Sequence, residues 1–398
     1  MRSEFLAVPE LVRVSVDRSS GEPRAVVIIK STTLLLKYLL KLRSFRFIFQ
    51  PTSAGYLVYG IEVTDDPSHP ATIWSFLEQE AEREGLAALF RNSKFDVFLF
   101  NEAVVNVAQS QCILSATDGA HAITIQATKL KPESEKILTD ELGNLMDQLQ
   151  RGTSLLGGGK AEIAGPILWE KIKSTYVTNR LELSSLSIFD QDEGGQQEQI
   201  ALWLTDNLNP DGSIINPKIH ETPRPRELCD LLFSHEYGAF LFESKVLSLL
   251  DRKDQLPERG KLQRTIIAHI DKATRQLAGA LKNVRRGYKV TDKNDNEIAL
   301  ELSKPPHAII IVPDLSLLSG VTKFSGEYFC GFAKKANCFF HILDLSELLR
   351  IVQAAEMIAK RGRTITPLMA FDYYLIERAK YAVDKPDPHF EVLIRFSD

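Results

Sequence analysis

Two acidic residues and a lysine have an unusual setting near the middle of the chain. Asp230 adjoins one apolar run, and Glu243 and Lys245 follow a second one, with twelve residues between the two acids. The turn-like segment 234–238 separates the runs, so we expect a β-hairpin with one carboxylate on each strand. Residues two apart on a strand face the same way, and cross-strand neighbours lie about 5 Å apart. Glu243 and Lys245 should therefore project together, with Asp230 opposite.

Carboxylates this close repel each other unless a cation or a proton lies between them. Mg²⁺ prefers oxygen ligands and typically binds one or two protein carboxylates together with substrate phosphates. A nearby lysine can orient or deprotonate water, while the metal stabilises the charge that develops on a phosphate. The pattern predicts that Asp230 and Glu243 bind Mg²⁺, which Mn²⁺ can replace, and that Lys245 positions or activates water. A structural ion pair or a solvated surface hairpin is the competing interpretation.

The arrangement Asp-x12-Glu-x-Lys across two strands resembles the PD-(D/E)XK superfamily, the restriction-endonuclease-like fold of Mg²⁺-dependent nucleases. The resemblance extends to a helix predicted around residues 196–204, where Glu198 matches an acidic residue that many members place there. A long helix at 264–284 and strands at 307–312 and 338–344 continue it, so that it covers about residues 190–365. The chain departs from the motif directly before Asp230, where Cys229 replaces the proline.

The resemblance implies an α/β fold, a mixed sheet flanked by helices, and phosphodiester hydrolysis by direct attack of water. It also implies a setting in restriction, repair or defence. Nucleases of this fold often direct a polar residue from the long helix toward the site, and Gln276 and Lys272 are candidates for that role. Members can lose activity and keep binding, so the alternative is a catalytically silent module that binds nucleic acid or a protein partner. Many members dimerise to cut both strands, which makes a homodimer a further expectation.

Basic residues concentrate directly after the candidate site strand. Residues 251–293 contain twelve Lys or Arg and five Asp or Glu, although the whole chain has a formal net charge of −4. Such a local excess suits contact with a phosphate backbone, most readily that of DNA, whereas a solvated helix face is the other interpretation. Backbone contacts alone do not distinguish DNA from RNA. The candidates for nucleic-acid binding are Lys253, Arg259, Lys261, Arg264, Lys272 and Arg275.

The first 130 residues predict a separate α+β domain whose role the residues do not indicate. Turn signals and apolar alternation predict its strands, and helical spacing predicts one helix. The expected strands are 5–16, 24–30, 44–50, 56–63, 95–100, 104–107 and 121–128, and the expected helix is 74–90.

Residues 131–190 are expected to form a helical linker, which leaves 191–398 as the nuclease-like domain. An amphipathic helix should begin at Pro132, and a second helix should cover 166–179. The glycine-rich segment 152–160 between them predicts a flexible hinge. It does not fit a phosphate-binding loop, because Ser154 stands where that motif needs its first glycine.

Composition places the 398-residue chain among ordinary globular proteins, with 44% hydrophobic and 25% charged residues. No apolar run approaches the roughly 20 residues that span a bilayer, and no basic-then-apolar segment opens the chain. The four cysteines form no C-x-x-C pair. We therefore expect reduced thiols in a cytoplasmic protein that does not contact a membrane.

Overall fold

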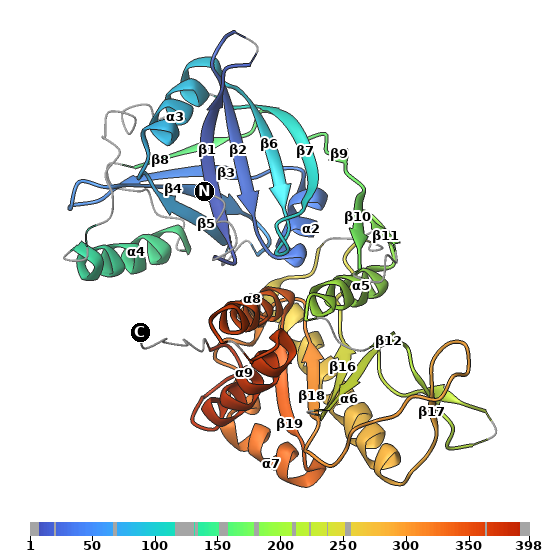
Figure 1. Ribbon diagram of the computed structural model, residues 1–398. Helices are drawn as coiled ribbons and strands as arrows, with labels where there is room; N and C mark the ends of the chain where they lie inside the picture. The colour runs from blue at the N-terminus through green and yellow to red at the C-terminus, as the bar shows by residue number, and fades with distance from the viewer. Residues whose placement is uncertain are drawn as a thin grey trace. The chain divides into compact units, whose positions relative to one another are not determined.

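The computed structural model describes residues 8–19, 21–66, 70–115, 131, 134–150, 158–178, 183–208, 212–222, 224–236, 238–250, 256–362 and 364–390. The chain divides into two compact units (Figure 1). The N-terminal unit comprises Met1–Ser174, Ser187–Phe189 and Leu249–Glu258, and the C-terminal unit comprises Thr175–Leu186, Asp190–Ser248 and Arg259–Asp398. Within the described residues, no helix is long and apolar enough to cross a membrane.

Two sheets form the N-terminal unit. One has the order β1 (Leu11–Asp17), β2 (Arg24–Lys30), β6 (Lys94–Phe100), β7 (Asn106–Ile113) and β9 (Glu170–Lys171). The other has the order β5 (Ala71–Phe76), β4 (Leu57–Val63), β3 (Arg46–Pro51) and β8 (Gly159–Glu162). Side chains of the two sheets meet where the rings of Phe47 and Phe95 pack edge to face, 5.6 Å apart. The helices are α2 (Thr33–Leu42), α3 (Glu80–Asn92) and α4 (Glu135–Gln150).

The helix predicted at 74–90 is wrong in its first turn and a half. Trp74 belongs to β5, in which inward and outward side chains alternate, and α3 begins only at Glu80. A capping box between Gln79 and Glu82 fixes that start, because each side chain pairs with a backbone N–H at the end of the helix. Residues 74–76 therefore belong to the strand that precedes this cap, and the helix begins only after the cap.

The predicted linker also needs correction. The described part of the helix expected at 166–179, residues 166–178, is not helical; β9 and β10 (Ser174–Val177) lie in it, and β10 pairs with β11 (Leu183–Leu186). Gly159 and Lys160, expected in a hinge, begin β8 and pair with β3. The amphipathic helix is confirmed as α4, and its Leu145 packs on Ile48 and Val58 of the N-terminal unit. Residues 152–157 of the predicted hinge and the strand predicted at 121–128 lie outside the described residues.

A five-stranded mixed sheet forms the centre of the C-terminal unit, which confirms the α/β class. Its order is β12 (Ser213–Ile215), β15 (Leu231–His235), β16 (Gly238–Ser244), β18 (His307–Ile311) and β19 (Phe339–Leu343). The first three strands are antiparallel, and β16, β18 and β19 are parallel. A smaller sheet has the order β14 (Arg226–Glu227), β13 (Lys218–Ile219) and β17 (Val290–Thr291).

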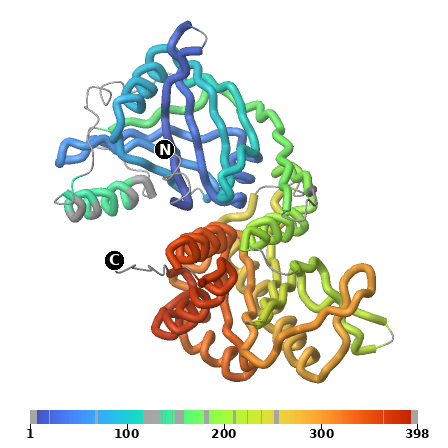
Figure 2. Tube along the Cα trace, viewed as in Figure 1, coloured from blue at the N-terminus to red at the C-terminus, as the bar shows by residue number. Residues whose placement is uncertain are grey.

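Helices cover this mixed sheet. α5 (Glu193–Asp206) packs on β12, β16 and α8 (Leu345–Arg361), while α7 (Gly326–Ala336) and α9 (Pro367–Ala382) pack on β19. The long α6 (Arg259–Arg285) connects β16 to β18 and buries Ile266, Ile270, Ala273 and Leu277 against them, at the spacing of one helix face. The Cα trace follows the chain through this order from the yellow-green α5 to the red α9 (Figure 2).

Candidate functional site

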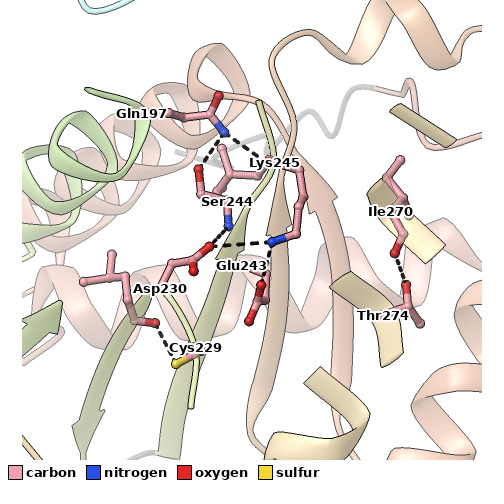
Figure 3. Close-up of polar contacts among 10 residues, drawn as sticks. Gln197, Cys229, Asp230, Glu243, Ser244, Lys245, Ile270 and Thr274 are labelled. Atoms are coloured by element: carbon pink, nitrogen blue, oxygen red, sulfur yellow. Dashed lines mark hydrogen bonds and ion pairs between the residues drawn. The ribbon is translucent and has the colours of Figure 1, made fainter. Parts of the chain in front are cut away.

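Hairpin register places Asp230 across from Glu243. Leu231 pairs with Phe242 in the β15–β16 ladder, so Asp230, which directly precedes β15, stands opposite Glu243. The Asp230 N–H donates to the Phe242 carbonyl at 3.0 Å. Figure 3 shows the second bond, in which Asp230 Oδ2 accepts from the Ser244 N–H at 2.5 Å. The aspartate is thus fixed at both its backbone and its side chain to the strand that carries the glutamate.

Lys245 contacts both carboxylates. Its Nζ lies 2.7 Å from Glu243 Oε2 and 3.9 Å from Asp230 Oδ2 (Figure 3). The Glu243 side chain is 2% exposed, and those of Asp230 and Lys245 are 14% and 15% exposed. The structure therefore brings together the three residues that the sequence singled out, at the carboxyl end of β16 and largely shielded from solvent.

Two further carboxyl groups approach Asp230. The side chain of Glu227, in β14, hydrogen-bonds to that of Asp230, and Glu198, on α5, lies within electrostatic range of both. The sequence indicated Glu198 but not Glu227. Glu227 lies at the site because β14 pairs with β13. This strand has only two residues, so no periodicity in the sequence predicts the pairing.

The pKa of Glu198, Glu227 and Glu243 is raised to about 7 in each case, and burial is the largest cause. The charge of Asp230 contributes to all three of these shifts, and for Glu227 its hydrogen bond contributes as well. Lys245 acts in the opposite direction on each of them. Four carboxyl groups opposed by one ammonium leave an excess of negative charge, which a bound cation would offset.

The donor chemistry of the site fits a hard divalent ion. Mg²⁺ usually retains several waters and takes only one or two protein carboxylates, which Asp230 and Glu243 supply, whereas structural Zn²⁺ sites use closed sets of Cys and His. Among the described residues, no group of three or more His, Cys, Asp and Glu side chains is arranged to hold a metal ion by itself. Water and phosphate oxygens would therefore have to complete the coordination.

Comparisons of the chain with protein-family models, with curated proteins and with solved structures find no match. Any assignment of function therefore rests on the chemistry and geometry of the site. The main feature of the site is the contact of Lys245 with the buried Glu243 and the partly buried Asp230.

Gln197, which the sequence reading did not single out as functional, ties the site to its neighbouring strand. The Gln197 side chain, on α5, is buried, and its Nε2 donates to Ser244 Oγ at 3.0 Å and to the Ile311 carbonyl at 3.1 Å (Figure 3). The Lys245 N–H donates to the same Ile311 carbonyl at 2.8 Å. One amide thus links the ends of β16 and β18 next to Lys245.

Replacing Gln197 with alanine should destabilise the protein by about 1–2 kcal/mol, because two buried hydrogen bonds are lost. If the site is catalytic, cleavage should also slow about 10-fold at saturating metal, because Ser244 and Lys245 lose a positional restraint. Urea unfolding and single-turnover rates measure the two effects. The matched control is Gln199→Ala on the same helix, since Gln199 bonds to Ser184 instead, at 2.7 Å. An equal rate loss in both variants would contradict a positioning role for Gln197.

The remaining predicted residues lie on or near α6. Gln276 is exposed, and within the described residues the hydrogen bonds and ion pairs of the site do not include it. Arg259 is half-buried, and Lys253 lies outside the described residues. The other basic candidates, all exposed on α6, are Lys261, Arg264, Lys272 and Arg275.

Proposed function

We propose that this protein is a Mg²⁺-dependent nuclease that hydrolyses phosphodiester bonds of DNA. The observation that carries the proposal is the contact of Lys245 with both Asp230 and Glu243, in surroundings that raise carboxyl pKa values to about 7. Strongly perturbed carboxyl groups that converge on one point are characteristic of functional sites.

The order of elements supports a restriction-endonuclease-like fold for the C-terminal unit. The helix α5 precedes the antiparallel strands β12, β15 and β16. Lys245 directly follows the last of these strands. The long α6 follows, and the chain returns in β18, parallel to β16. This is the sequence of elements that the resemblance of Asp-x12-Glu-x-Lys implied.

In this mechanism, Asp230 and Glu243 would hold the metal through their carboxylate oxygens. When bound, the ion would stabilise the negative charge that develops on the phosphate. Lys245 would orient the attacking water, which displaces the leaving oxygen directly, without a covalent enzyme intermediate. Glu198, whose carboxyl pKa is raised to about 7, would accept a proton from water in the site.

One contact favours the alternative of a catalytically silent module that binds nucleic acid or a protein. The ammonium of Lys245 already compensates Glu243 at 2.7 Å, as it would in a purely structural ion pair. In that case the site would hold the hairpin together and take up no metal.

Cleavage assays on supercoiled plasmid, linear duplex, single-stranded DNA and RNA test the proposal. We expect the protein to cleave DNA in Mg²⁺ or Mn²⁺ and to leave it intact in excess chelator. Folded protein that binds DNA but cleaves none of these substrates would favour the binding module. Cleavage of equal rate in chelator would contradict a metal-dependent mechanism.

A further inference from the structure

The exposed side of α6 carries cations along its whole length. All 27 residues of this helix are described, and Asp271 is its only acid, engaged by Lys323 at 2.5 Å. The side opposite the sheet has a set of exposed basic side chains, which we call the α6 basic face. Its members are Lys261, Arg264, Lys272, Arg275, Lys282 and, just beyond the end of the helix, Arg286.

The α6 basic face has an internal repeat. Lys261 and Arg264 form a pair that recurs eleven residues later as Lys272 and Arg275, and Arg286 stands eleven residues after Arg275. Eleven residues make just over three turns of an α-helix, so the repeated pairs lie on one face about 16 Å apart along the axis. A solvated helix surface does not require such a repeat.

Short side chains separate the pairs. Ala268 and Gly279, also eleven residues apart, occupy the same face between successive cations. A Cβ added at Gly279 would meet nothing within 4 Å, so the backbone is open to close approach there. A long, straight partner could therefore lie along the helix and contact each pair in turn.

His269 connects the α6 basic face to the candidate site. It is half-buried on α6, and besides burial, both Lys245 and Lys272 lower its pKa, so it lies within electrostatic range of the site lysine and of the basic face.

We infer that the α6 basic face binds the phosphate backbone of double-stranded DNA. This inference rests on the proposed nuclease function and names its substrate as a duplex. Duplex DNA carries one charge per about 1.7 Å of axis, and its major groove is about 12 Å wide, with the bordering phosphates somewhat farther apart. The interval of about 16 Å between cation pairs matches phosphates on either side of that groove.

The composition of α6 argues against a single strand as the ligand. Proteins that hold single strands stack the bases on aromatic rings beside their cations. α6 has no Phe, Tyr or Trp among its residues. Contacts limited to the backbone suit a duplex, whose bases are already stacked.

Gly279 allows the inference to be tested without disturbing the core. Binding of a 30-base-pair duplex and of a single strand of equal length would be measured by fluorescence anisotropy in chelator, where no cleavage occurs. Gly279→Glu places a carboxylate between the cation pairs and should weaken duplex binding at least 10-fold, whereas Gly279→Gln, which fills the same space without the charge, should bind at least about 5-fold more tightly than Gly279→Glu. The single strand should bind at least 10-fold more weakly than the duplex.

Salt dependence supplies a second readout. Each lost phosphate contact lowers the slope of log affinity against log salt by about 0.9. Lys272→Gln with Arg275→Gln should therefore lower the slope by about 2, while Lys334→Gln with Lys335→Gln on α7 should leave it unchanged. Equal affinities of the two Gly279 variants, an unchanged slope, or tighter binding of the single strand would overturn the inference.

These results are separable from those on catalysis. A protein that cleaves DNA but binds duplex independently of α6 would keep the nuclease function and lose this inference. A protein that binds duplex through α6 but never cleaves it would support this inference and contradict the nuclease function.

Discussion

Replacing Asp230 with asparagine, or Lys245 with methionine, should lower Mg²⁺-dependent cleavage at least about 10³-fold. Asparagine keeps the size of Asp230 and an oxygen that can accept the Ser244 N–H, but it removes the charge that would hold a metal. Methionine keeps the length of Lys245 and removes the ammonium that lies 2.7 Å from Glu243. Single-turnover rates at saturating metal measure the loss.

Matched controls for these variants are Asp140→Asn on α4 and Lys335→Met on α7, both exposed positions. They change the same charges by the same chemistry and should retain the wild-type rate. Thermal unfolding would show that all four proteins are folded. Cleavage that persists in both site variants would place the activity elsewhere.

The Glu243→Gln variant should be more stable than wild type by roughly 1–3 kcal/mol at pH 8 in chelator. Burial and the charge of Asp230 raise the pKa of Glu243 from 4.5 to about 7 in the folded protein. Since the folded value lies above the unfolded one, the stability that this group contributes is full below about pH 4.5 and is lost as the pH rises through about 7. Glutamine stays neutral and avoids that loss. Urea unfolding at pH 5.5 and pH 8 measures the difference, which should be much smaller at the lower pH.

Glu297→Gln, at an exposed position, should show no comparable pH dependence. Mg²⁺ should stabilise wild type at pH 8 and have little effect on Glu243→Gln, because the metal binds only the ionised carboxylate. The opposite sign, with the glutamine variant less stable at pH 8, would show that the Lys245–Glu243 ion pair outweighs the repulsion. It would favour the structural interpretation of the site.

Local pattern was sufficient to predict the central hairpin. The apolar runs beside Asp230 and Glu243, separated by a turn, predict two strands, and the observed register places the two acids opposite each other. The long helix was equally predictable from the helical spacing of Ile266, Ile270 and Leu277, although α6 starts at Arg259, five residues before the predicted start.

Residues that approach the site through tertiary contacts were not predictable in the same way. Glu227 depends on the pairing of β14 with β13, and Gln197 depends on how α5 rotates against β16. Trp74 was misassigned because helical spacing from Leu77 onward extended backward over a strand that alternates only to Phe76. The periodicity of apolar residues predicts each helix or strand separately, but it does not predict which of these elements pack together.

Direct metal binding decides the central claim. Isothermal titration of Mg²⁺ and of Mn²⁺ would be performed at pH 7 on wild type, Asp230→Asn and Asp140→Asn, each with and without uncleavable duplex. We expect wild type to take up the metal and to release protons from the carboxyl groups whose pKa is near 7. Asp230→Asn should bind at least about 10-fold more weakly, and Asp140→Asn should bind like wild type. No uptake by wild type under either condition, or equal affinity in Asp230→Asn, would contradict it.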